Sequence, residues 1–214
     1  MDELLAALTD SDFDFTGQAS VVRLDRNGSR LELLLELRAF SGTFERQAWL
    51  LTCGVERFSL LRSEPFYGLE LATDHVLLAP YHDVRVQLGM RGSADDPNAA
   101  VADLWTAHNA LAGNWFPFDT FLNRSMPLTE LLRSTAAVVA DGPARFIDAY
   151  VPILRAHGIE AYYITERPAK RWVDMAWQPE NTNVELLLLE PHDYIVGADF
   201  SARRTSVDLL PPVV

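Results

Sequence analysis

The stretch 19-ASVVRLDRNGSRLELLLELR-38 decides the first part of the fold. Over 31–37, leucines at every second position alternate mainly with charged residues, which is the pattern of a strand with one buried face. Residues 19–25 also have the character of a strand, and the Asn27-Gly28 pair between the two runs is typical of a tight primed turn. The sequence therefore predicts a β-hairpin here.

Further runs of period two predict that the sheet continues beyond this hairpin. Ser41-Gly42, Pro65 and Pro80 separate these runs. A single glycine, Gly54, is too short for a hairpin loop, so it could instead mark a bulge in one long strand over 45–61. The connections are too short for helical crossovers, which predicts an antiparallel sheet of five or six strands. The expected strands cover 47–53, 55–61, 67–72 and 84–90.

From residue 96 onward the apolar period becomes that of a helix. Asp96-Pro97 is a helix start, and apolar residues follow at helical spacing up to Gly113, so we expect this helix to lie across the sheet. Two more helices are predicted, joined at Asp141-Gly142, and Pro152 should kink or divide the second one. Their ranges are 127–140 and 143–157. Four strands are then expected at 160–165, 172–177, 184–189 and 194–200.

The order sheet, three helices, sheet is that of an α+β protein. We expect residues 1–124 to form an antiparallel β-sheet with a helix, and residues 125–214 to form a helical hairpin and a four-strand antiparallel meander. The boundary is placed at Arg124-Ser125-Met126, which lacks the composition of a free linker. The two halves are therefore expected to pack together, and a single compact unit is the alternative.

Composition excludes several classes of function. The chain has 18 basic and 30 acidic side chains and a net charge of −12, which argues against nucleic-acid binding. A hydrophobic fraction of 49% with 22% charged residues is typical of a globular protein and not of a disordered one. The acidic start and the absence of a long apolar run predict a soluble, cytoplasmic protein with no membrane partner. The single cysteine, Cys53, lies in an apolar setting and is expected to be a buried, inert thiol.

The sequence motifs of nucleotide, zinc and serine-hydrolase chemistry are absent, so no cofactor is predicted. A weaker signal comes from two adjacent pairs, Asp74-His75 and His82-Asp83, which flank one short connection. Imidazole and carboxylate together could bind a metal or transfer protons, but a solvated or turn-capping role is the simpler interpretation. His108 shares the apolar face of its helix, which indicates a hydrogen-bonded core residue rather than a ligand.

A local positive site follows from the expected meander. Its connections at 166–171 and 191–193 would fall at one end of the sheet, where arginine could hold a phosphate or carboxylate through paired hydrogen bonds. A solvated hairpin loop is the simpler interpretation. The candidate anion-binding residues are Arg167, Lys170, Arg171 and His192.

Residues 114–121 are dense in aromatic rings. These rings either fill the junction between helix and sheet or form an exposed patch for a partner, with Trp115, Phe116 and Phe118 as the candidate surface. The N-terminal segment 2–14 combines acidic residues with three leucines. It has the pattern of a short amphipathic helix, which could dock on its own sheet or on a basic partner.

Three features favour a non-catalytic protein–protein interaction module: the missing catalytic motifs, the negative charge and the aromatic segment. The charge would steer a basic protein partner, as in neutralising or chaperone-like proteins. The alternative is a small-molecule or anion-binding protein, or a hydrolase-type enzyme, with its site at the loop ends. A homodimer formed through an exposed sheet edge is a third possibility.

Overall fold

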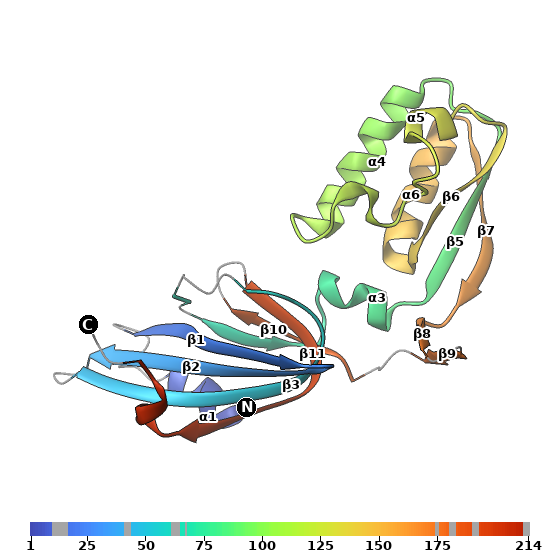
Figure 1. Ribbon diagram of the computed structural model, residues 1–214. Helices are drawn as coiled ribbons and strands as arrows, with labels where there is room; N and C mark the ends of the chain where they lie inside the picture. The colour runs from blue at the N-terminus through green and yellow to red at the C-terminus, as the bar shows by residue number, and fades with distance from the viewer. Residues whose placement is uncertain are drawn as a thin grey trace. The chain divides into compact units, whose positions relative to one another are not determined.

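The computed structural model has an α+β fold in two compact units (Figure 1). Unit 1 comprises Met1–Asp74 and Asn183–Val214, and unit 2 comprises His75–Thr182. No helix in the described part of the chain is long and apolar enough to cross a membrane. The structure describes residues 1–9, 17–40, 44–60, 65–66, 68–173, 176–179, 183–189 and 193–211.

Unit 1 is built on an antiparallel sheet with the strand order β1-β2-β3-β11-β10-β4. The predicted β1–β2 hairpin is confirmed, because Asn27 pairs with Arg30 around a two-residue loop. Gly28 opens that loop with a φ of +59°, a conformation that glycine adopts without strain. The strands are β1 (Gln18–Asn27), β2 (Arg30–Phe40), β3 (Phe44–Ser59), β4 (Leu69–Ala72), β10 (Glu185–Leu189) and β11 (Asp193–Thr205).

Gly54 lies inside β3, so the structure has one long strand here and not two strands joined at Gly54. The pairing of β3 with β11 shifts register between Val196 and Gly197 and again between Ala198 and Ser201. A side chain on Gly197 would collide with the carbonyl of Gly54, so the absence of a Cβ lets the two strands approach at these bulges.

The two edges of this sheet approach one another. Ala19 of β1 and Phe66, which precedes β4, exchange two backbone hydrogen bonds of 3.0 and 2.8 Å. The N-terminal helix α1 (Asp2–Leu8) buries Leu4 and Leu8 in the core, so this segment docks on its own sheet. The alternating residues predicted to face inward do so, and the core includes Leu31, Leu33, Leu35, Leu37, Trp49, Leu51, Cys53 and Val55.

A segment near the C-terminus covers the opposite face of β2 and β3. Leu210, which follows the 3₁₀ turn η3 (Val207–Leu209), packs on Leu34 and Ala48. Arg46 binds this segment by donating a hydrogen bond of 2.8 Å from Nη2 to the carbonyl of Pro211.

Glu36 lies buried on this face, with its side chain only 2% exposed. Its carboxylate accepts hydrogen bonds from Arg46 Nε at 2.6 Å and from Arg38 Nη2 at 2.9 Å. Burial alone would raise the pKa of Glu36, but the hydrogen bonds and charges of the two arginines outweigh burial and lower the pKa below its usual value. Glu36 is therefore a buried carboxylate held in its charged form.

Unit 2 is a three-stranded antiparallel sheet of order β6-β5-β7, with the helices α4 and α6 packed against each other on one side of it (Figure 1). As predicted, Asp96 caps α4 by accepting hydrogen bonds from the amides of Asn98 and Ala99. The elements are η1 (Val76–Leu78), α3 (Ala79–His82), β5 (Arg85–Arg91), α4 (Pro97–Ala112), η2 (Phe118–Thr120), α5 (Leu128–Leu131), β6 (Ala136–Pro143), α6 (Ala144–Ala156), β7 (Glu160–Arg167), β8 (Lys170–Val173) and β9 (Ala176–Pro179).

Three helix predictions need correction. The helical hairpin does not form, because the range 127–140 contains the single turn α5 and then the strand β6. The apolar run 136–140 is short, and pairing with β5 decides its conformation. The helix α4 belongs to unit 2 together with the expected strand 84–90, and it packs on α6. Pro152 does not divide α6, which continues through it to Ala156.

The predicted four-strand meander is also wrong. β7 pairs with β5, β8 pairs with β9, and β10 and β11 complete the sheet of unit 1. The last two expected strands do pair with each other as β10 and β11, but β11 also pairs with β3 over most of its length, so pairing is not confined to neighbours along the chain. The expected boundary at Arg124 falls inside unit 2, where β5 before it pairs with β6 and β7 after it.

Candidate functional site

A polar cavity of about 570 Å³ lies on the sheet of unit 2. The segment before α5 forms one wall, because it runs beside β6 as a short extra strand. Asn123 donates its amide to the carbonyl of Val139 at 2.8 Å, and Asp141 donates its amide to the carbonyl of Phe121 at 2.9 Å. The lining residues are Arg85 and Gln87 of β5, Val138, Ala140 and Asp141 of β6, and the segment 120–124.

The side chains of Arg85 and Gln87 point away from the helices. They alternate along β5 with the buried residues Val86 and Leu88, and the side chains of neighbouring strand residues lie on opposite faces. The helix α6 packs against β5, so the buried pair faces the helices. The cavity therefore opens on the face of the sheet opposite to α4 and α6.

Two arginines share one carboxylate on this face. Arg85 donates from Nε to Asp141 Oδ1 at 2.6 Å, and Arg167 donates from Nη2 to Asp141 Oδ2 at 3.0 Å. The register of the sheet brings them together, since Arg85 lies directly opposite Arg167 on β7. Two guanidinium groups and one carboxylate leave a local charge of +1 on a chain with a net charge of −12.

Hydrogen-bond donors outnumber acceptors around the cavity. In the described residues, Nη1 and Nη2 of Arg85 and the side-chain amide of Gln87 have no hydrogen-bond partner. Arg124 uses only its Nε, which donates to the backbone carbonyl of Asp119 at 2.9 Å and lies 3.2 Å from that residue's carboxylate. Such an arrangement complements an anion that offers several acceptor oxygens.

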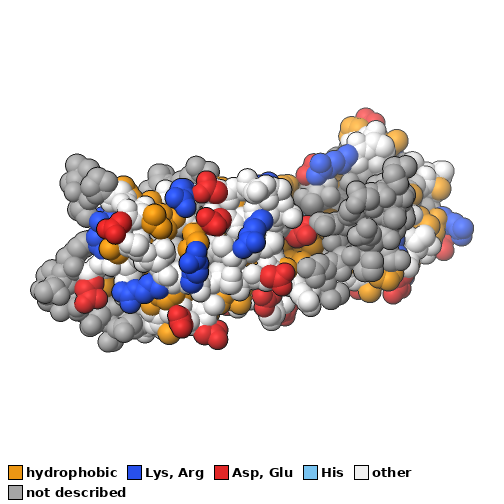
Figure 2. All heavy atoms as spheres, turned by 60° about the horizontal axis from the view of Figure 1, so that its bottom comes forward, with side chains coloured by type: hydrophobic (Ala, Val, Ile, Leu, Met, Phe, Trp, Pro, Cys, Tyr) orange, Lys and Arg blue, Asp and Glu red, His pale blue; other side chains and the backbone are white. Residues whose placement is uncertain are grey.

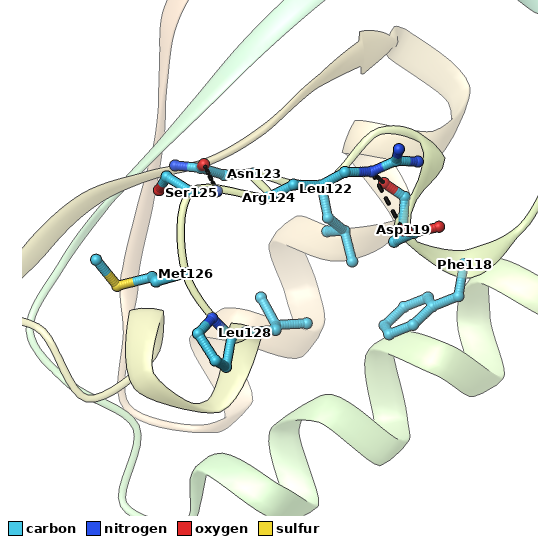
Figure 3. Close-up of a pocket in the computed structure, with 9 residues that line it drawn as sticks. Phe118, Asp119, Leu122, Asn123, Arg124, Ser125, Met126 and Leu128 are labelled. Atoms are coloured by element: carbon cyan, nitrogen blue, oxygen red, sulfur yellow. Dashed lines mark hydrogen bonds and ion pairs between the residues drawn. The ribbon is translucent and has the colours of Figure 1, made fainter.

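An apolar groove of about 530 Å³ adjoins this cavity, and the two share Leu122, Asn123 and Arg124. Figure 3 shows Phe118, Leu122 and Leu128 around the groove, with Arg124 extending toward Asp119 above it. The side chain of Met126, 43% exposed, also lines the groove. The groove walls come from η2 and α5, which pack on α4, so the groove lies on the helix side of the segment.

Comparison with known proteins gives no guide to this site. No protein-family model, curated protein or solved structure matches the chain. The assignment therefore depends on the geometry of the residues themselves.

Of the four candidate anion-binding residues, Arg167 lies beside the cavity through its bond to Asp141. The backbones of Lys170 and Arg171 belong to β8, and their side chains are outside the described part. His192 also lies outside the described residues. Because the meander does not form, its geometry no longer supports grouping these four residues.

The predicted cluster of histidine and aspartate does not assemble as a metal site in the part of the chain that the structure describes. Asp83 binds Arg145 at the start of α6 through two hydrogen bonds of 2.5 and 2.8 Å. His75 caps η1 by accepting the amide of Leu77 on Nδ1 at 3.2 Å, which is a turn-capping role. Asp74 ends the first stretch of unit 1, and His82 ends α3.

The aromatic segment largely packs within unit 2. Phe116 is buried, while Trp115 and Phe118 are partly exposed, so Phe116 is not available as a partner surface. Trp115 meets the ring of His75 edge-on at 5.3 Å between ring centroids. His108 is fully buried beneath this segment, as expected for a core histidine.

The cavity contains residues that sequence reasoning missed. Arg85 and Gln87 fall in an expected strand and Arg124 falls in the expected boundary, and neither local pattern marks a binding site. Their i, i+2 spacing could have marked Arg85 and Gln87 as neighbours on one face. The approach of Arg124 and Asp141 depends on the pairing of segment 120–124 with β6, which no local pattern signals.

Proposed function

We propose that this protein is a non-catalytic binding protein that holds an anionic group, a carboxylate or a phosphate, in the cavity beside Arg85, Gln87 and Arg124. The observation that supports the proposal is the surplus of hydrogen-bond donors around one cavity. Arginine suits this role because its planar guanidinium can donate two parallel hydrogen bonds to one anion.

Binding without catalysis fits the chemistry of the cavity. Among the described residues that line it, the one carboxylate is that of Asp141, which Arg85 and Arg167 already bind. An anion in the cavity would meet groups that attract and orient it, and a permanently charged guanidinium neither accepts a proton nor acts as a nucleophile.

On one face of the molecule, the described charged side chains do not form the broad acidic surface that a basic partner would require (Figure 2). On the face shown in Figure 2, acidic and basic side chains are interspersed, and neither sign gathers into a broad patch. A net charge of −12 slows the approach of anions, so the local donors must provide the affinity. We therefore expect weak binding of a small free anion, with a Kd of the order of 1 mM.

The test is a nuclear magnetic resonance titration of the protein with sodium phosphate, and separately with sodium acetate, that follows the Nε–Hε signals of the arginines. The expected result is a saturable shift of the Arg85 signal that is lost in Arg124→Ala. Arg133→Ala is the matched control, because Arg133 is exposed and lines neither the cavity nor the groove. A titration without saturation, or one that Arg124→Ala leaves unchanged, would overturn the proposal.

A further inference from the structure

The edge of the segment 122–124 offers backbone groups for pairing. Leu122 lies opposite Ala140 of β6, while its neighbours Phe121 and Asn123 direct their hydrogen bonds to β6. In an antiparallel pair, the polar backbone groups of successive residues point alternately toward and away from the partner strand. The backbone of Leu122 and Arg124 therefore points away from β6.

These outward groups are largely unused. The amide of Leu122 donates to the carbonyl of Asp119 at 3.3 Å. In the ranges that the structure describes, the carbonyl of Leu122 and both backbone groups of Arg124 have no hydrogen-bond partner. An unpaired edge of this kind accepts a further strand from a partner.

The two hollows flank this edge on opposite sides. The donor-rich cavity opens on the face of the sheet away from the helices, and the apolar groove lies on the helix side. Consecutive side chains of a strand point to opposite faces. A strand added at this edge would therefore direct one side chain toward Arg85 and Gln87 in the cavity, and the next one toward Phe118, Met126 and Leu128 in the groove, with Arg124 lining both hollows.

We infer that the partner is an extended peptide segment that pairs with the edge of Leu122–Arg124 and places an acidic side chain at the cavity and an adjacent apolar side chain in the groove. This inference rests on the proposed anion-binding function and names its ligand class. Charge complementarity selects the acidic residue, since Arg124 and Arg85 supply the donors, and the apolar lining of the groove selects its neighbour.

The probe is a fluorescein-labelled hexapeptide of alternating leucine and glutamate, and its binding is measured by fluorescence anisotropy. A peptide with three leucines followed by three glutamates has the same composition and charge without the alternation. We expect the alternating peptide to bind about tenfold more tightly, because only it places the two side-chain types on opposite faces. Two further peptides carry N-methyl groups on alternate backbone nitrogens, one at the odd positions and one at the even positions. One of the two should bind severalfold more weakly, because its methyl groups remove the hydrogen bonds to the edge of the segment.

Two protein variants separate the parts of the inference. Met126→Ser should weaken binding of the alternating peptide about fivefold through the loss of apolar contact, and should leave phosphate binding unchanged. Leu111→Ser is the matched control, because Leu111 is similarly exposed on α4 and lines neither hollow.

The outcomes distinguish this inference from the proposed function. If phosphate binds at Arg85 but both peptides bind equally, or if neither of the two N-methylated peptides binds more weakly than the unmethylated one, the peptide inference is wrong and the anion site stands. If neither phosphate nor the peptide binds, both fail. Tighter binding of the alternating peptide that requires Arg124 and Met126 supports the inference.

Discussion

Among the residues that the structure describes, each unit buries one strongly polar side chain, and the two units do so in opposite ways. In unit 1, Glu36 is ionised beside Arg38 and Arg46, and these arginines reach toward solvent. In unit 2, His108 is fully buried among aromatic rings. A buried charge needs opposite charges at its side, whereas a neutral group needs only its hydrogen bonds.

Both ring nitrogens of His108 have hydrogen-bond partners. Its Nδ1 lies 2.7 Å from the hydroxyl of Tyr150, and its Nε2 lies 2.9 Å from the carbonyl of Phe116. A ring protonated on Nε2 donates to that carbonyl and accepts the tyrosine proton on Nδ1, which satisfies both nitrogens. Burial raises the pKa of Tyr150 well above its ordinary value, so its hydroxyl keeps the proton that it donates. The contrast teaches that unit 1 stabilises a buried charge with two opposite charges, while unit 2 satisfies a buried polar ring with hydrogen bonds to a hydroxyl and a carbonyl.

The largest effect should come from the aliphatic core of unit 1. Leu33→Ala removes a fully buried side chain and should lower the free energy of unfolding of this unit by about 3–4 kcal/mol. Cys53 supplies the measurement, because burial raises the pKa of its thiol to about 12 and keeps it unreactive until the unit opens. The urea concentration at which Cys53 becomes labelled should therefore be lower in Leu33→Ala than in the wild-type protein.

Leu209→Ala is the matched control, since Leu209 is 51% exposed. Equal shifts for the two variants would contradict the placement of Leu33 in the core. Hydrogen exchange read separately in α4 and α6 would sharpen the comparison, because Leu33→Ala should leave these helices unchanged if the two units unfold independently.

The second effect concerns the ionised Glu36. Its pKa is lowered in the folded protein, so its contribution to stability is complete above the ordinary value of 4.5 and is lost as the pH falls below that value. Glu36→Gln should cost about 2 kcal/mol at neutral pH, because it leaves Arg38 and Arg46 without their counter-charge.

Urea unfolding from pH 7 to pH 3, followed by labelling of Cys53, is the measurement. The variant should lose less stability with acid than the wild-type protein loses. If the free energy of unfolding of the two proteins falls equally with pH, Glu36 does not contribute to the acid sensitivity of unit 1. The contrast between the two units would then be wrong.

A smaller effect is expected for the neutral pair in unit 2. Tyr150→Phe removes the hydroxyl that bonds to His108 and leaves a buried nitrogen without its partner, which should cost about 1–2 kcal/mol. Tyr163→Phe is the matched control, because it removes an exposed hydroxyl that bonds to Asp148. Hydrogen exchange in α4 and α6 measures both variants, and a loss for Tyr163→Phe as large as for Tyr150→Phe would contradict this account of His108.

The smallest effect is expected at Asp199, in the bulged part of β11. Its φ of +56° lies in the left-handed region, which costs a non-glycine residue a fraction of a kcal/mol to about 1 kcal/mol. Asp199→Gly should leave the stability of unit 1 unchanged or raise it slightly, whereas Asp199→Val should lower it. A thermal melt of each variant checks the order, and a Val variant as stable as the Gly variant would refute it.

Local patterns predicted the elements whose signals lie in adjacent residues. The β1–β2 hairpin follows from alternation on both sides of Gly28, and α4 follows from a cap at Asp96 with helical spacing behind it. These signals suffice because turns and caps are short-range hydrogen-bonding problems. The burial of His108 was likewise predicted from its position on the apolar face of its helix.

The misplaced strand β6 shows where local reasoning ends. Its residues Ala136 to Ala140 form a short apolar run that suits a helix or a strand equally. The Asp141-Gly142 pair favours a loop by its residue types, yet Gly142 lies in the strand, where the ring of Phe121 occupies the space that a side chain would fill. Only the partner strand and the packed ring determine which conformation forms.

The candidate site likewise combines residues that the sequence makes visible with an arrangement that only long-range pairing creates. The residue types were visible in the sequence, and Arg167 was singled out for its charge. Its partners Arg85 and Asp141 come from strands far apart in the chain, and the sheet register joins them. The sequence by itself determined the α+β class, the hairpin and the helix starts, because these depend on contacts between near neighbours. The tertiary structure alone decided the division into units and the donor-rich cavity, because both depend on pairing between distant strands, which the total packing of the chain selects.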